Sequence, residues 1–450
     1  SISGEFRVFG FSKEDYTDFG SEDINDLQNG IAYAKWLAEN MEAAEDYNDQ
    51  WGGIDGAPPF EPSAEPKEIS KDADDVAYFS QRLRLYAKYA VTEGVTIHTR
   101  MDFGEGTWGA AGQDTIRFEN NNDLQIDRAF LEIDKERYNF RAGQQYYGFG
   151  NSIAVDHQGT GFLVSTKGPV VFTAFFNKLD ENGLTDDTGT EDDDMYGASV
   201  KYKADTFAAE LFYAYQDGID FGGKTFLNGL VAPKTLTDAF DIDVVYADED
   251  GDQSVIGLAA DTKLGAVNVK GELNIFDGEL DADIDTIDFA GTQLYLDANT
   301  ALSSALTLGG SLFYAQGYDD KLQLTELSDF GSWLPWEYGY FETNYGLFSG
   351  SSFDPFKLNA GTVSLLVYGA YQASDDLGFK ASVQYGMEEE DALAEYDYMS
   401  YNLSAQYMIA KNTQIFAQFN YLDVDVDVVE LGSVDTDSAM GIAAGIQANF

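Results

Sequence analysis

The chain has 450 residues, no cysteine, and a formal net charge of −53. The charge excludes general nucleic-acid binding through a basic surface, and the lack of cysteine excludes disulfides and thiolate metal sites. Glycine, tyrosine and phenylalanine are plentiful while proline is scarce, which is typical of β-sheet rather than of disorder. No apolar run is long enough for a transmembrane helix, and the first residues already resemble a strand rather than a signal peptide.

After an opening strand, residues 12–75 form a long polar stretch that we expect to be the first outer loop. Within it, Leu27, Ile31, Ala34, Ala38 and Met41 fall on one stripe at helical spacing. We therefore expect a helix in this loop, with three alternative roles. It caps the barrel described below, plugs it, or latches onto a neighbouring subunit.

The next segment, "AYFSQRLRLYAKYAV" (77–91), alternates apolar residues with Arg82, Arg84 and Lys88. A turn, "TEG", leads to "VTIHTRMDF" (95–103), in which His98 and Arg100 lie on the polar side. Segments with the same period of two continue to the end of the chain. They are 124–134, 137–146, 160–166, 170–178, 195–204, 206–216, 254–263, 266–276, 290–298, 305–316, 361–373, 378–388, 396–409, 413–423 and 438–450.

This pattern predicts about eighteen strands, with sixteen as the alternative, and places "FDIDVVY" (240–246) within a loop. The connections alternate between short turns, such as "KER", "KGP" and "AKN", and long acidic stretches at 179–194, 277–288, 388–397 and 423–437. Segregation of long loops from short turns is typical of a transmembrane β-barrel with short periplasmic turns. We therefore predict an all-β fold in which residues 1–450 form a single antiparallel barrel.

The basic residues fix which side of the strands faces water. Slipping the 77–91 strand by one residue would turn Arg82, Arg84 and Lys88 toward lipid, at a cost on the order of 10 kcal/mol. Several charges cannot lie in a dry core, so the interior must contain water. The last strand then ends at Phe450, an aromatic residue suited to a membrane interface.

The alternating C-terminal strand with Phe450, "DRAFLEI" (127–133) and "FRAGQQYYGFGN" (140–151) resemble the Gram-negative outer-membrane porins, both general and substrate-specific. The resemblance implies passive diffusion of small hydrophilic solutes, location in the outer membrane, and a homotrimer. It also implies contact with lipid and lipopolysaccharide, and recognition of Phe450 by the barrel-assembly machinery. In such porins the third outer loop folds inward and narrows the pore. Here that loop would be 144–160, with Tyr146, Tyr147, Asp156 and His157 as its constriction residues.

All eight arginines lie within the first 141 residues. Strand parity places six basic residues on one wall of the pore, which would orient polar solutes and attract anions. These are Arg82, Arg84, Lys88, Arg100, Arg128 and Arg141. The alternative is that these positions only tolerate charge, or pair with carboxylates such as Asp102 and Glu132. The acidic outer loops would favour cations at the mouth, so the sequence leaves the sign of the selectivity open.

The sequence predicts no cofactor, metal site or enzymatic activity. The acidic runs offer oxygen ligands for Ca²⁺ or Mg²⁺ but lack the spacing of a calcium-binding loop, and any divalent ion there would bridge to lipopolysaccharide. No GxSxG or HExxH motif accompanies His98 and His157. Two further alternatives remain, namely a secreted acidic β-protein and a plugged barrel that serves as a scaffold.

Overall fold

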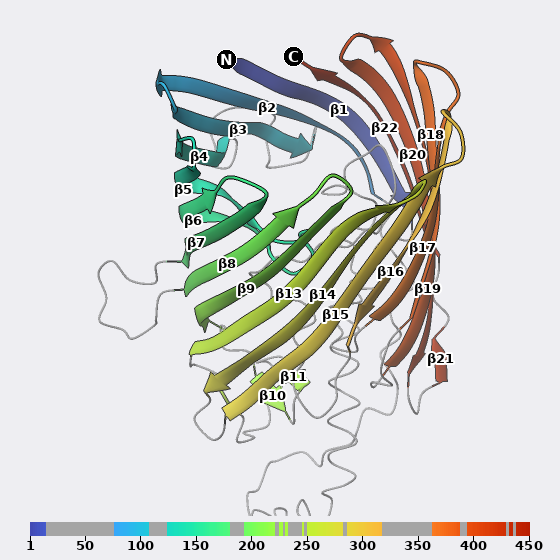
Figure 1. Cartoon of the computed structure of the whole chain (residues 1–450). Coiled ribbons are helices and arrows are strands. Elements are labelled where there is room, and N and C mark those ends of the chain that lie inside the picture. Colours follow the sequence, from blue (N-terminus) through green and yellow to red (C-terminus); the bar gives the residue numbers. More distant parts are fainter. Residues whose placement is uncertain are drawn as a thin grey trace, which may run out of the picture.

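The computed structural model describes residues 1–14, 76–107, 124–180, 193–220, 225–227, 230–232, 245–246, 250–281, 286–316, 362–387, 394–428, 432–434 and 438–450. Figure 1 shows these residues as one strongly tilted barrel, with the N- and C-termini on neighbouring strands at the same end. The described residues include no helix that is long and apolar enough to cross a membrane. The helix expected within 12–75 lies outside the described residues.

Most of the described strands form one large antiparallel sheet in which each barrel strand pairs with the next barrel strand along the chain, and β1 pairs with β22 to close the barrel. The large sheet has nineteen strands, of which three-residue β21 pairs only with β20, so eighteen strands make up the barrel. They are β1 (Ile2–Glu14), β2 (Val76–Thr92), β3 (Val95–Thr107), β4 (Leu124–Asp134), β5 (Tyr138–Gly148), β6 (Asp156–Thr166), β7 (Val170–Asp180), β8 (Asp193–Lys203), β9 (Phe207–Asp220), β13 (Asp250–Leu264), β14 (Val267–Asp281), β15 (Thr286–Ala301), β16 (Leu306–Ala315), β17 (Thr362–Gln372), β18 (Leu377–Met387), β19 (Ala394–Ala410), β20 (Thr413–Val428) and β22 (Ala439–Asn449).

The predicted barrel of eighteen antiparallel strands is therefore confirmed. Val245–Tyr246 (β12) belongs to a separate three-stranded sheet with β10 (Thr225–Leu227) and β11 (Leu230–Ala232), so "FDIDVVY" adds no barrel strand. β21 spans Gly432–Val434.

Several strands run further than the sequence predicts, into the acidic stretches. β14 and β15 stay in register as far as Asp281 opposite Thr286, so only 282–285 separates them where a loop over 277–288 is expected. β20 likewise continues to Val428. The reason is that "DVDVDV" itself alternates with a period of two, and beyond the membrane both faces of a strand meet water, so charge does not end it.

The two faces of the sheet differ as a membrane barrel requires. On the outside, large apolar side chains are exposed, among them Phe172, Leu258, Ile275 and Leu403. On the inside, polar side chains such as Asn274 and Gln384 are buried. A secreted sandwich would bury its apolar faces against a second sheet. The exposed outer face of this closed barrel is instead suited to lipid.

Candidate functional site

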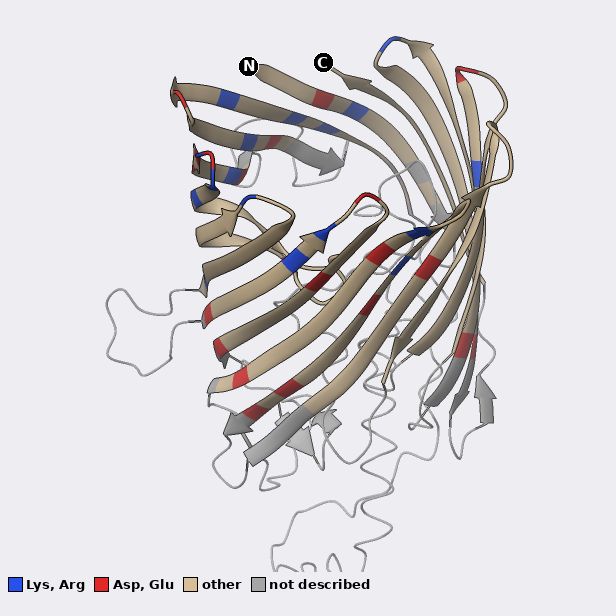
Figure 2. Cartoon of the chain, in the orientation of Figure 1, with Lys and Arg blue, Asp and Glu red and all other residues tan. Residues whose placement is uncertain are grey.

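The six basic residues of the predicted wall lie on the consecutive strands β2 to β5. Cross-strand register places Arg82 opposite Arg7, Tyr86 opposite Arg100, and Arg100 opposite Arg128. Residues directly opposite one another share a face of the sheet. Figure 2 shows basic and acidic segments close together on these strands, near the end of the barrel that holds the termini.

Most of these basic groups contact a carboxylate. Arg82 Nη2 lies 2.7 Å from Glu5 Oε1, and Arg84 Nη2 lies 2.6 Å from Asp102 Oδ2. Arg100 pairs with Asp127, and Arg141 Nε lies 3.5 Å from Glu132 Oε1. The wall is therefore a row of ion pairs.

Arg128 differs from its neighbours. Its Nε is buried and makes no hydrogen bond, and no ion pair joins Arg128 to any described residue. Its guanidinium carbon lies 5.7 Å from the centroid of the Tyr146 ring, a cation–π contact. Lys88 is exposed near the closing turn of β2. Arg128 and Lys88 thus contribute positive charge without a carboxylate of any described residue within ion-pair distance.

Sequence reasoning did not place Arg7, Glu5 or Asp127 at this wall. Arg7 is 2% exposed, and its guanidinium carbon lies 5.5 Å from the ring centroid of Phe9. The alternation "EFRVF" in the opening strand, in step with 77–91, was the signal that could have identified Glu5 and Arg7. Asp127 could not be found by parity, because the register shifts between Arg100 and Met101, where β3 pairs with β4.

His98 belongs to the same wall and has defined partners. Its Nε2 lies 2.9 Å from Glu132 Oε2, and its ring stacks on Phe130 at 4.7 Å between centroids. His157 lies elsewhere, near the start of β6, opposite Tyr147. The two histidines are therefore not brought together.

The candidate constriction loop 144–160 divides into three parts. Residues 144–148 extend β5 and residues 156–160 begin β6, with Gly148 opposite Asp156. Only 149–155, here called the β5–β6 segment, leaves the ladder. Phe149, Ile153, Ala154 and Val155 are all buried, at 3% exposure or less.

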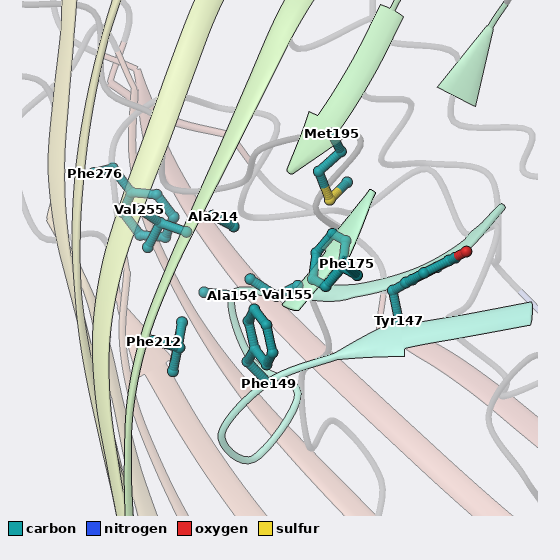
Figure 3. Close-up of a cluster of buried hydrophobic side chains, with 10 residues drawn as sticks. All are labelled: Tyr147, Phe149, Ala154, Val155, Phe175, Met195, Phe212, Ala214, Val255 and Phe276. Atoms are coloured by element: carbon teal, nitrogen blue, oxygen red, sulfur yellow. The ribbon is translucent and has the colours of Figure 1, made fainter. Parts of the chain in front are cut away.

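The β5–β6 segment packs against the inner face of distant strands. Phe149, Ala154 and Val155 join Tyr147 in a cluster with side chains of β7, β8, β9, β13 and β14 (Figure 3). The strand members of this cluster are Phe175, Met195, Phe212, Ala214, Val255 and Phe276. Ile153 packs with Tyr295, Phe313 and Ala315 of β15 and β16.

A buried carboxylate of β14 fixes the end of this segment. Glu272 is 2% exposed and accepts hydrogen bonds from the backbone N–H of Asn151 and from Asn274 Nδ2. Asn151 Nδ2 also donates to the carbonyl oxygen of Gly271 at 3.1 Å. Gly150 has a φ of 59°, and a Cβ there would lie 2.4 Å from Glu272 Oε2, so the turn requires glycine.

The two predicted tyrosines have different surroundings. Tyr147 is fully buried in the apolar cluster, and Tyr146 makes a 2.7 Å hydrogen bond with Ser152 Oγ. Asp156 and His157 are part of β6. Phe450 follows β22 and lies beside β1. Its backbone N–H donates to Gly4 O at 2.9 Å, and its ring is 59% exposed.

Among the described residues, no group of three or more histidine, aspartate or glutamate side chains is arranged to hold a metal ion. The acidic run 179–194 falls mostly outside the described residues, as do the interiors of the other outer loops. Divalent binding there remains a sequence-based expectation.

A closed antiparallel barrel with an apolar outer face and a charged inner face is a transmembrane β-barrel of the outer membrane. No protein-family model matches the sequence, and no curated protein matches it. Solved structures do match the fold. OccK11 (OpdR) of Pseudomonas aeruginosa aligns with 100% of this chain and 95% of its own, at 9% identity and a TM-score of 0.52. A BenF-like porin of Pseudomonas fluorescens Pf-5 aligns with 100% and 98%, at 10% identity and a TM-score of 0.52.

The chain therefore has the fold of the outer-membrane porins, the class that the sequence resemblance predicts. OccK9 (OpdG) of Pseudomonas aeruginosa gives the same result, with 100% and 98% of the two chains aligned, 10% identity and a TM-score of 0.51.

Proposed function

We propose that the barrel is a passive, non-enzymatic pore for small hydrophilic solutes, narrowed where the β5–β6 segment faces the basic wall. One observation carries this proposal. The segment leaves the wall between β5 and β6 and packs against the inner face of β7 to β16, while the charged groups lie on β1 to β5. The remaining passage would then have an apolar side and a charged side.

The charges of the wall favour anions in the passage. Seven basic side chains, counting Arg7, stand against the carboxylates of Glu5, Asp102, Asp127 and Glu132. The excess is positive, and Arg128 lies beside Tyr146, the neighbour of the apolar cluster. Electrostatic lining of this kind sorts ions at a narrow zone.

Single-channel conductance in a planar bilayer tests the pore. We expect discrete steps, in groups of three if the barrel assembles as a trimer, and a larger step for Phe149→Ala because that ring fills the interior. Phe172→Ala is the control, since Phe172 is 56% exposed on the outer face. Insertion into the bilayer without conductance would refute the pore and favour a plugged scaffold.

The reversal potential under a salt gradient tests the wall. We expect Arg128→Gln to shift it toward cation preference, whereas Arg137→Gln, in the exposed turn between β4 and β5, should leave it unchanged. An equal shift for both variants would mean that overall charge, rather than the wall, governs selectivity.

A further inference from the structure

A second concave site lies on the inner face of β13 to β15, near the short turns. It is a cavity of about 410 Å³ whose charged lining includes Lys203, Lys263, Lys270, Asp261 and Asp297. The turn between β8 and β9 forms its rim. No residue of the β5–β6 segment contributes to it, so this site is separate from the narrow zone described above.

Two opposite charges in this cavity face each other without forming an ion pair. Lys270 of β14 is the direct register partner of Asp297 of β15. Opposite charges placed directly across an antiparallel pair normally attract and interact. Neither side chain, however, has an ion pair with any described residue.

Each of the two charges is held by other groups. Lys270 Nζ lies 5.2 Å from the centroid of the Tyr295 ring, a cation–π contact. Asp297 is 6% exposed, and its Oδ2 accepts a 2.8 Å hydrogen bond from Tyr368 Oη. Its Oδ1 accepts from Asn299 Nδ2 at 3.2 Å. A Cβ on Gly309 would lie 2.4 Å from Tyr368 Cζ, so Gly309 gives the tyrosine its path to Asp297.

The rim of the cavity also carries charges of both signs. Lys203, Lys263 and Asp261 are exposed, and none of them forms an ion pair with a described residue. Asn268 Nδ2 donates to Asn299 Oδ1 at 3.0 Å, which orients the amide next to Asp297. The cavity therefore contains both positive and negative groups. Contacts with neighbouring residues keep Lys270 and Asp297 from pairing with each other.

We propose that this cavity binds a small zwitterionic solute that carries both a carboxylate and an ammonium group. Lys270 receives the carboxylate, and Asp297, with its hydrogen-bonded support, receives the ammonium. A solute with a single charge can pair with only one of these two groups and leaves the other without an opposite charge. The volume lies within the range of sites for small molecules.

Equilibrium binding to the folded protein in detergent micelles tests this site without any conductance measurement, so it can fail while the pore stands, and the converse also holds. The probes for isothermal titration calorimetry are L-norvaline, valerate and butylammonium, which share one alkyl chain and differ only in charged groups. We expect norvaline to bind about tenfold or more tightly than either singly charged probe, because each loses a charge-assisted hydrogen bond.

Lys270→Met and Asp297→Asn should each weaken norvaline binding about tenfold and make it similar to that of the singly charged probes. Lys167→Met is the matched control, because Lys167 also lies at the short-turn end but pairs with Asp134 on another wall. If either variant does not fold, Tyr368→Phe removes only the hydroxyl that supports Asp297, and should weaken binding as well. Equal binding of the three probes, no norvaline binding, or unchanged binding in the variants would overturn the proposal.

Discussion

Glu272 shows how one side chain can hold a whole connection. It is almost completely buried, makes no ion pair with a described residue, and accepts hydrogen bonds from the β5–β6 segment and from its own strand. A buried carboxylate without a cation is stable only when donors surround it. Glu272 therefore stabilises the fold by accepting a hydrogen bond from the backbone N–H of Asn151.

Replacing Glu272 by alanine should loosen the β5–β6 segment. The Asn151 N–H then loses its acceptor, and we expect the free energy of unfolding to fall by about 2–3 kcal/mol, with noisier single-channel currents. Glu272→Gln keeps an acceptor oxygen and should lose less. Denaturant titration in micelles measures both. Glu279→Ala, an exposed site on the same strand, is the control, and an equal loss there would contradict the assigned role.

At the scale of the element, the two faces of each barrel strand meet different environments. β19 is an example. Leu403 is 55% exposed on the outside, while Asn402 and Ser404 are buried on the inside. Gln406 shares the inner face with them. A one-residue slip of the strand would exchange these faces and expose polar groups to lipid.

We expect Leu403→Arg to destabilise the barrel by about 2–4 kcal/mol in lipid vesicles, because the charge then meets hydrocarbon. Gln406→Arg, three residues along the same strand, should be tolerated because its side chain lies on the polar inner face of the barrel. Reversible denaturant unfolding in vesicles compares the two. Equal losses would mean that the faces of β19 are assigned the wrong way round.

Strand patterns of this kind are why the sequence predicts the barrel so closely. Charge and apolar residues alternate in "QRLRLYAKYAV", so both the strand and its inner face can be read directly. The apolar cluster was harder to anticipate. Phe175, Phe212 and Phe276 share the inner faces of their strands with polar residues such as Asn177, Glu210 and Asn274, and periodicity does not show what packs against them.

The electrostatic partners also went beyond the sequence. Parity places Arg100 on the inner wall, but its contact with Asp127 depends on a shift in the β3–β4 register. Lys270 and Asp297 lie directly opposite each other in an unshifted register, yet they contact two different tyrosines. Side-chain packing across three or four strands determines which partner each charged group contacts. The local spacing of residues in the sequence does not predict these contacts.

At the scale of the whole molecule, the pairing of β1 with β22 leaves the barrel without an open edge. Val8 lies opposite Ile446, and Ser12 lies opposite Ile442. Because the chain has no cysteine, a disulfide can be introduced here without competition.

We expect Val8→Cys combined with Ile446→Cys to form a disulfide on oxidation and to raise the free energy of unfolding by about 2–4 kcal/mol. Val8→Cys combined with Ile442→Cys is the control, because those positions are not partners and should remain reduced. Electrophoretic mobility with and without reductant measures the cross-link. Cross-linking of the control pair, or none in the first pair, would contradict the register of closure.

The same closure has a consequence for the order of folding. Every other pair of neighbouring barrel strands is consecutive along the chain. β1 and β22, in contrast, come from the two ends of the described chain. Contacts between residues far apart in sequence require the largest loss of chain entropy and form slowly. The final hydrogen bonds between these two strands should therefore be the slow, committing step of assembly, and until they form the growing sheet carries two unpaired edges open to other chains.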